Sequence, residues 1–341
     1  MRYAIMGAGA VGSLLGGMLA RAGLPVVLIG RAAHVEAVSR DGLEVSGLVG
    51  PFRVRPEATV SPEGVREADA VLLCVKSQDT PAACAAIAPY LPDEAPVISI
   101  QNGVRNVDLI DESPLGPGRG VGGSAVFNAV FLEPGRVLLT TSGEIILGAA
   151  SRDGRFGDRM ARVAREMRQA GLEVRATGNI EAVLWSKLLI NLNNGLGALT
   201  GQSLEEGMMD PVARRISAAL LAEGIRVTRD AGVRLETIPK VDPNRILKLL
   251  TLPLPTFLLR RLFRLMVRTH PEARWSTWQS LAKGQPTEIA YLNGEIVRLA
   301  ESCGVHAPYN RAVRDMVMEA EKKGAPPGFT SSEVGRRLSL G

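Results

Sequence analysis

The stretch MRYAIMGAGAVGSLLGGMLARAG, residues 1–23, decides how the first half of the chain folds. Its apolar run Tyr3–Met6 has the length of a buried strand, and a leucine-rich helical pattern follows after a glycine-rich turn, Gly7-Ala8-Gly9-Ala10-Val11-Gly12. In this order, the first glycine allows the tight turn, the second lets a phosphate approach the backbone, and the third lets the helix pack closely on the strand. The helix N-terminus would receive the phosphate charge, so the turn is a predicted dinucleotide site.

The rest of the first half alternates short apolar runs with helical patterns, which is typical of a parallel sheet covered by helices on both faces. Strands are predicted at Val26–Gly30, Val71–Val75 and Val97–Ile100, and helices at Gly12–Ala22, His34–Arg40 and Thr80–Ala88. Two longer strands, Val121–Phe131 and Arg136–Leu147, flank the turn Pro134-Gly135, and a helix over Asp158–Ala170 and a strand at Glu173–Arg175 follow. We therefore predict an α/β domain of the Rossmann type with a mostly parallel sheet.

From Ile180 onward the apolar spacing becomes helical, with no convincing strand pattern. We therefore predict a dinucleotide-binding domain at residues 1–180 and an all-helical substrate and catalytic domain at residues 181–341. The tail after Gly324, which contains Pro326-Pro327-Gly328, is expected to be loose.

Composition restricts the classes of function. The 341 residues carry a net charge of +5 and are 46% hydrophobic, as in an ordinary globular enzyme with a surface that mildly favours anions. Aromatic residues make up only 4% and the arginines are spread along the chain, which argues against a nucleic-acid binder. Three cysteines without metal-ligand spacing favour a reducing, cytoplasmic compartment.

The apolar, basic stretch at residues 246–267 is interrupted by two prolines and four cationic residues, so it does not predict a membrane span. A membrane-surface helix is a weaker interpretation than a solvated face over a core. Part of this stretch, Leu249–Met266, is also where a homodimer would bury surface, with packing inside its own domain as the alternative.

Polar residues follow three of the predicted strands. Arg31 comes after the second strand, where an Asp or Glu would accept from the ribose of NAD; a guanidinium there instead fits a 2′-phosphate and predicts NADP(H). Lys76 would add a second positive charge, and the amide of Asn102 would contact nicotinamide and substrate. The alternatives are a solvated arginine, a lysine that extends from a sheet edge, and an Asn-Gly turn with no ligand.

The catalytic candidates lie on one predicted helix, Ile180–Leu196. Lys187, Asn191 and Asn194 share a stripe of this helix, whereas most of its remaining circumference is apolar. A buried polar stripe must be hydrogen-bonded or line a wet cleft. Reduction of a carbonyl by hydride needs a proton donor, and Lys187 would supply it in a cleft between the domains.

Two further candidates are ambiguous from their spacing alone. Gln285-Pro286-Thr287-Glu288 predicts the start of another helix, where Glu288 would serve as a cap. Ser276 offers a hydroxyl for a carboxylate, as residues in many loops do.

With these motifs in hand, the whole chain resembles the ketopantoate reductase family (2-dehydropantoate 2-reductases). The resemblance extends from the glycine turn through Arg31, Val75-Lys76 and Gln101-Asn102-Gly103 to Leu184-Trp185-Ser186-Lys187-Leu188, Asn191, Ser276, Thr287-Glu288-Ile289 and Tyr291-Leu292-Asn293-Gly294. It implies NADPH-dependent reduction of 2-dehydropantoate to (R)-pantoate on the route to pantothenate and coenzyme A. It also implies that Lys187 donates the proton, Glu288 holds the lysine, cofactor and substrate, Asn102 contacts the cofactor, Asn191 the substrate hydroxyl and Ser276 its carboxylate.

The chain departs from the family pattern on the substrate side. Gly195 stands where many members have a further Asn, for which Asn194 would substitute; Ala290 and Ser280 each replace a frequent Asp, and Gln101 replaces a frequent His. Two alternatives therefore stay open: a reductase of another 2-oxo acid, and a catalytically silent NADP(H)-binding sensor.

Overall fold

The computed structural model describes residues 1–236, 242–266 and 275–340, with the backbone alone at 262–266. The chain divides into two compact units, one formed by residues 1–181 and the other, among the described residues, by 182–340. Each unit has its own elements and core.

The first unit is built on an eight-stranded sheet with the order β12-β11-β8-β7-β6-β1-β2-β5. Strands β5, β2, β1, β6, β7 and β8 are parallel, and β11 joins β8 in the antiparallel sense. The predicted mostly parallel sheet is confirmed. The strands are β1 Tyr3–Met6, β2 Val26–Ile29, β5 Glu57–Thr59, β6 Ala70–Leu73, β7 Val97–Ser99, β8 Gly120–Ala125, β11 Ile145–Gly148 and β12 Val174–Thr177.

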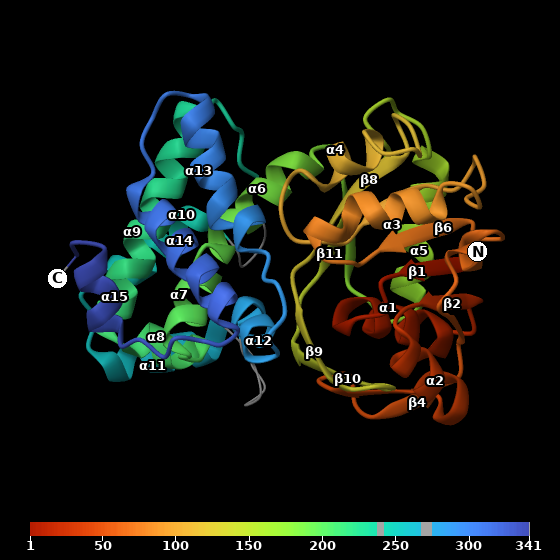
Figure 1. Ribbon diagram of the computed structural model, residues 1–341, viewed down its shortest axis with the longest axis horizontal. Helices are drawn as coiled ribbons and strands as arrows, with labels where there is room; N and C mark the ends of the chain where they lie inside the picture. Colours follow the sequence, from red (N-terminus) through yellow and green to blue (C-terminus); the bar gives the residue numbers. More distant parts are fainter. Residues whose placement is uncertain (237–241, 267–274, 341) are drawn as a thin grey trace. The chain divides into compact units, whose positions relative to one another are not determined.

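Helices cover both faces of this sheet because alternate strand residues point to opposite sides. Tyr3 and Ile5 belong to a core formed with α1 (Ala10–Arg21) and α5 (Gly157–Gln169), whereas Ala4 belongs to a second core that includes residues of α3 (Thr80–Ile87) and α4 (Asn106–Asp111). In Figure 1, α1 and α3 lie on different sides of the sheet. The remaining helical segments of this unit are α2 Ala32–Asp41, η1 Pro62–Val65 and η2 Ser77–Asp79.

A second, four-stranded sheet covers the outer side of α1. It has the order β4-β3-β10-β9, formed by β3 Leu43–Gly47, β4 Phe52–Val54, β9 Asn128–Glu133 and β10 Arg136–Thr141 (Figure 1). Two adjacent glycines let α1 fit between the sheets: a Cβ at Gly16 would lie 2.5 Å from Leu28 of the large sheet, and one at Gly17 would lie 2.7 Å from Val45 of the small sheet.

This second sheet corrects the strand prediction. Val121–Phe131 is not one strand but β8 and part of β9, and Arg136–Leu147 is β10 and part of β11, so each segment passes from one sheet to the other. Both crossings occur at one place, where Gly143 lies so close to Val126 that a Cβ would be 2.0 Å from its carbonyl oxygen. The prediction missed β3, β4 and β5, whose short segments are only partly buried. The predicted turn at Pro134-Gly135 does join β9 to β10.

The second unit is helical throughout the residues that the structure describes, as predicted. Apolar side chains such as Leu189, Leu220, Ile296 and Val313 are buried between the helices. The helical elements are α6 Ile180–Asn191, α7 Asn193–Thr200, α8 Leu204–Met209, α9 Pro211–Asp230, α10 Pro243–Thr251, α11 Thr256–Met266, α12 Ser276–Ala282, η3 Ile289–Tyr291, α13 Asn293–Ser302, α14 Pro308–Lys323 and α15 Ser331–Arg337.

Three predictions about this unit are wrong. The predicted helix Ile180–Leu196 is interrupted at Leu192, although this residue keeps helical dihedral angles of φ −57° and ψ −27°. The segment at Glu288 does not start a long helix; it precedes the short turn η3, and α13 begins only at Asn293. The tail is not loose, because α15 packs on α9, Val334 is buried, and the N–H of Phe329 donates to the carbonyl of Leu199 at 2.9 Å.

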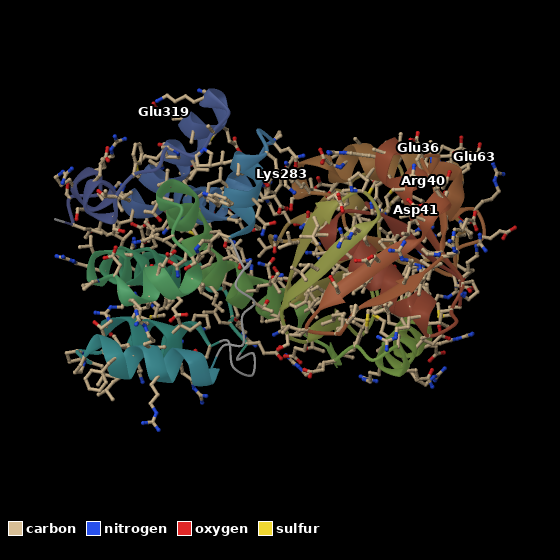
Figure 2. All side chains as sticks on the ribbon, turned by 90° about the horizontal axis from the view of Figure 1, so that it is seen from below. Glu36, Arg40, Asp41, Glu63, Lys283 and Glu319 are labelled. Atoms are coloured by element: carbon tan, nitrogen blue, oxygen red, sulfur yellow. The ribbon has the colours of Figure 1, made fainter. Side chains whose placement is uncertain are left out.

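Ion pairs lie on the surface of both units but do not form a functional site. Arg40 and Asp41 form one at the end of α2, with nitrogen and oxygen 2.8 Å apart, and Glu319 accepts from Lys323 at 2.7 Å on α14 (Figure 2). Exposed pairs of this kind contribute little to stability because water screens them. No helix within the described ranges is long and apolar enough to cross a membrane.

Candidate functional site

The glycine turn has the shape that its sequence predicts. Gly7 adopts φ +103°, which favours glycine, and the N–H groups of Gly7 and Ala8 both donate to the carbonyl of Ile29 at 3.0 Å. A Cβ at Gly12 would lie 2.2 Å from the carbonyl oxygen of Gly7, so the helix can approach the turn only without a side chain there. The turn is therefore fixed against the end of β2 and the start of α1.

The start of α1 is open. Gly9 is exposed, and apart from its own neighbours in the chain nothing lies within 4 Å of the position a Cβ would take. No side chain caps the helix, which begins at Ala10. The first N–H groups of a helix lack partners within it, so Ala10, Val11 and Gly12 offer donors to an anion. These features fit the pyrophosphate of a dinucleotide.

Arg31 lies just beyond the carboxyl end of β2. It is exposed at the start of α2, and its carbonyl is fixed by the N–H groups of His34 and Val35 at 3.0 and 3.1 Å. The backbone of Arg31 is thereby held in place while its guanidinium stays accessible to a ligand phosphate.

Lys76 and Asn102 follow the ends of β6 and β7, and a buried glutamine connects these two ends. The Gln101 amide nitrogen donates to the carbonyl of Val75 at 2.9 Å and to the Thr80 hydroxyl at 2.7 Å. The carbonyl of Asn102 accepts from the Ser77 hydroxyl at 2.8 Å and from the Asn106 amide at 2.6 Å. Gln101, which replaces a histidine frequent in the family pattern, thus fixes the backbone next to Lys76 and Asn102.

The structure brings the predicted cofactor residues of the first unit to one edge of the sheet, whereas Glu288 belongs to the second unit. Because β7, β6, β1 and β2 are adjacent and parallel, Asn102, Lys76, the glycine turn and Arg31 follow their carboxyl ends in that order. The chain order reverses between β1 and β6, and ligands of open α/β sheets bind at such a switch point. A Cβ at Gly7 would lie 2.6 Å from the Val75 backbone nitrogen, so the turn directly contacts the segment before Lys76.

In the second unit, Lys187 lies on α6 among buried residues. Leu184, Trp185, Leu188 and Leu189 around it are each less than a tenth exposed, whereas Lys187 itself is half-buried. The preceding residue, Ser186, anchors this turn, because its hydroxyl donates to the carbonyl of Glu236 at 2.8 Å.

Lys187 and Glu288 act on each other electrostatically although they are far apart in the sequence. Burial lowers the pKa of Lys187 to about 8, and the negative charge of Glu288 opposes that shift. At neutral pH the ammonium is therefore present but gives up its proton more readily than an exposed lysine would. A lysine with these properties suits a proton donor.

The interruption at Leu192 separates two members of the predicted polar stripe. Asn191 is half-buried at the end of α6, whereas Asn194 lies beyond the interruption on α7 and is 6% exposed. Asn191 is therefore the member of the predicted stripe that lies on the same helix as Lys187.

Two glycines of α7 contact the segments that carry Ser276 and Glu288. A Cβ at Gly197 would lie 2.0 Å from the ring of Trp275, the residue before Ser276, and one at Gly195 would lie 3.2 Å from Ile289, the residue after Glu288. Both segments therefore pack on α7, the helix that follows the one bearing Lys187.

A small cavity of about 40 Å³ lies beside this arrangement, not at Lys187. It is lined by residues of α7 to α10 and by Trp275. Since a cavity needs only about 10–15 Å³ of such space to hold a water, this one has room for water.

The sequence interpretation missed the roles of two residues in holding this region. Trp275 fixes the segment of Ser276 on α7, and Asn293 donates to the carbonyl of Leu192 at 3.1 Å. Asn293 was visible as part of Tyr291-Leu292-Asn293-Gly294, but only the fold shows that it contacts the end of the helix bearing Lys187. Trp275 gave no signal beyond being a large aromatic residue.

Comparison with known proteins matches both halves of the chain. The family model described as "Ketopantoate reductase PanE/ApbA" matches residues 3–152, and the one described as "Ketopantoate reductase PanE/ApbA C terminal" matches residues 179–321. The 2-dehydropantoate 2-reductase of Pyrococcus horikoshii is 30% identical over 330 residues, which cover 95% of this chain and 99% of that protein.

Solved structures agree with these matches. The PanE/ApbA family ketopantoate reductase from Ralstonia eutropha JMP134 has a TM-score of 0.79 and 33% identity, and the match covers 95% of this chain and 99% of that one. D-mandelate dehydrogenase, solved with NADH and anilino(oxo)acetate, has a TM-score of 0.79, 24% identity and the same coverage, and shows likeness of fold.

Proposed function

The chain belongs to the ketopantoate reductase PanE/ApbA family of oxidoreductases, and we propose that it reduces 2-dehydropantoate to (R)-pantoate with NADPH. The observation that carries this proposal is the half-buried Lys187 on its largely apolar helix, whose pKa is lowered by burial to about 8 against the opposing charge of Glu288. When bound, NADPH supplies the hydride that reduces the carbonyl carbon. Lys187 transfers a proton from Nζ to the carbonyl oxygen as that oxygen gains negative charge.

The other residues bind and orient. Ser276 and Asn191 receive the substrate carboxylate and hydroxyl, and Asn194 is proposed to add a contact on the same side. Glu288 holds Lys187 and contacts the cofactor and substrate. The reaction needs the substrate to reach both the nicotinamide and Lys187 in one complex.

The open start of α1 and the space at Gly9 support binding of a dinucleotide. We propose that Arg31 binds the 2′-phosphate and that Asn102 contacts the nicotinamide. Lys76 is proposed to add a second positive charge that attracts the phosphate groups of the cofactor. A related fold binds NADH in D-mandelate dehydrogenase, so the two coenzymes must be compared directly. Arg31 favours NADPH because its guanidinium forms paired hydrogen bonds with a phosphate.

A second candidate, a reductase of another 2-oxo acid, is favoured by position 195. A Cβ at Gly195 would lie 2.4 Å from the Val313 side chain, so the Asn frequent in the family does not fit here without repacking. A silent NADP(H) sensor is disfavoured because Lys187 and Glu288 are both present and coupled.

The test measures NADPH oxidation with 2-dehydropantoate and with a panel of branched and hydroxylated 2-oxo acids, using the full chain and its Lys187→Ala variant. We expect turnover of 2-dehydropantoate above the others, and a loss of about 10²–10⁴-fold in kcat on replacement of Lys187, with NADPH affinity nearly unchanged. Preference for another acid would select the second candidate. Tight NADPH binding without turnover of any acid would select the sensor, and an undiminished kcat would remove Lys187 from the mechanism.

We also propose a homodimer that buries part of α11. Phe257 and Leu258 on this helix are 71% and 40% exposed, which is unusual for large apolar side chains next to each other. The three cysteines are unpaired, which supports the proposed cytoplasmic compartment.

A further inference from the structure

A single buried amide links the two segments that carry Lys187 and Glu288. The side chain of Asn293 is fully buried, and its Nδ2 donates to the carbonyl of Leu192 at 3.1 Å. Leu192 is the residue at which α6 gives way to α7. Lys187 lies five residues before Leu192, and Glu288 lies five residues before Asn293. The hydrogen bond therefore joins both segments at an equal distance along the chain from their charged residues.

Asn293 is itself fixed by a chain of hydrogen bonds. Its Nδ2 also donates to the Asn310 side-chain oxygen at 2.9 Å, and the Asn310 amide nitrogen donates to Glu223 at 2.8 Å. The Glu223 carboxylate, on α9, further accepts the backbone N–H groups of Tyr309 and Asn310 at 3.0 and 2.8 Å, at the start of α14. Asn310 is fully buried and Glu223 is 6% exposed, so charge-assisted bonds in a dry environment hold the chain of contacts in place.

The orientation of the Asn293 amide costs stability because it leaves the side-chain oxygen unpaired. This indicates that the hydrogen bonds donated by its nitrogen are important. The Asn293 side-chain oxygen is buried and accepts no hydrogen bond within the described part of the chain. Such an orphaned acceptor reduces stability, and an apolar side chain of similar shape would avoid that loss. Both donors, in contrast, have partners, and one of these is the end of the helix that bears Lys187.

We propose that Asn293 is a positioning residue for the proton donor, because its hydrogen bond to the Leu192 carbonyl holds the Lys187 segment against the Glu288 segment. Asn293 acts through these two residues and touches neither substrate nor cofactor. The proposal rests on the function proposed above insofar as Lys187 donates the proton. Its prediction for Lys187 itself does not depend on which 2-oxo acid is the substrate.

The test removes the donors while keeping the shape. Asn293→Leu retains a side chain of similar shape without hydrogen-bonding groups, and Asn293→Ala serves as the second variant. Val317→Ala is the matched control, since Val317 is also fully buried in the second unit, on α14, and its truncation lowers stability without removing a hydrogen bond. In each full-length protein, the rate of acylation of the Lys187 amine is followed against pH by mass spectrometry, and kcat and KM are measured with the best 2-oxo acid.

We expect the acylation midpoint of Lys187 to move upward from about pH 8 in both Asn293 variants, because a loosened segment admits water around the ammonium. Weaker interaction with Glu288 acts in the opposite direction, but burial is the larger of the two effects on the pKa of Lys187. We also expect kcat to fall at least tenfold while the NADPH affinity is unchanged. The control should unfold at a lower temperature but titrate and turn over like the original protein.

An unshifted midpoint in Asn293→Leu, or an equal shift in Val317→Ala, would overturn the proposal. If Asn293→Leu does not fold, Asn293→Ala decides by the same readout, and if neither folds, the amide is a folding element and the proposal is wrong. A shifted midpoint in a protein that reduces none of the acids would leave the positioning role standing and reject only the proposed reaction.

Discussion

Lys187 can serve as an acid only while it holds a proton. Burial brings its pKa to about 8, against the opposing charge of Glu288, so the ammonium form is lost as the pH rises through that value. In the direction of reduction, kcat is expected to fall above about pH 8 by up to tenfold per pH unit. Oxidation of the hydroxy acid should show the opposite limb, since it needs the neutral amine.

The measurement is a pH profile of kcat in both directions between pH 6 and pH 10. Glu288→Gln gives the control with a defined sign, because loss of the opposing charge should move the reduction limb to lower pH. A reduction rate that stays level up to pH 10 would contradict the role of Lys187.

Arg31 is the single side chain that we propose selects the coenzyme. Arg31→Asp places a carboxylate beside the 2′ position of the ribose, which repels a phosphate and accepts from a hydroxyl. We expect the ratio of kcat/KM for NADPH to that for NADH to fall by at least tenfold. Arg21→Asp, an exposed arginine of the same unit at the far end of α1, is the control for the change of charge alone. An unchanged ratio in Arg31→Asp would refute the phosphate contact.

At the scale of elements, the glycines of α7 allow side chains of neighbouring segments to lie directly against its backbone. The ring of Trp275 lies where a Cβ of Gly197 would be, 2.0 Å from that position, and thereby seats α12 and Ser276. Gly197→Ala should displace this segment and raise KM for the 2-oxo acid about tenfold, with little change in NADPH affinity.

The matched control is Gly207→Ala on α8, where the nearest atom is 3.9 Å from the new Cβ. It should leave KM unchanged and stabilise its helix by about 0.5–1 kcal/mol. Steady-state kinetics and thermal unfolding of the two variants check this prediction. Equal kinetics in both would show that the seat of Trp275 does not determine substrate binding.

At the scale of the whole molecule, the exposed apolar residues of α11 bear on assembly. If Phe257 is buried against a second copy, the protein should have twice its monomer mass of 36.3 kDa in solution, and Phe257→Glu should convert it to monomers because a carboxylate is costly to bury. Light scattering after size-exclusion chromatography measures both. A monomeric original protein, or a variant that stays dimeric, would exclude this interface.

Much of the first unit could be predicted from sequence because the signals are local. A strand, a glycine turn and a helix follow each other at residues 3–21, and the turn needs glycine at Gly7 for its backbone angle and at Gly12 for its close contact. The split of residues 121–147 between two sheets could not be read, because the exchange depends on the contact of Gly143 with Val126.

The candidate site divides in the same way. Lys187 was predicted from a polar position on an otherwise apolar helix, which is a property of residues three and four apart. Its partner Glu288 lies 101 residues away, and spacing alone could not separate a functional carboxylate from a helix cap. The interruption at Leu192 was missed because no proline or glycine marks it; Asn293, from a distant segment, occupies its carbonyl.

The sequence by itself therefore determined the alternation of the main parallel strands with helices in the first half, the helical nature of the second, the glycine turn and the position of Lys187 on a largely apolar helix. Each of these follows from contacts between residues close in the chain, where backbone angles and the spacing of apolar side chains are sufficient. Only the tertiary structure decided the second sheet, the end of the Lys187 helix, the packed tail and the coupling of Lys187 to Glu288. These features depend on which segments, far apart in the sequence, pack against each other and exclude water. Whether a charge or an amide is buried is decided by that packing.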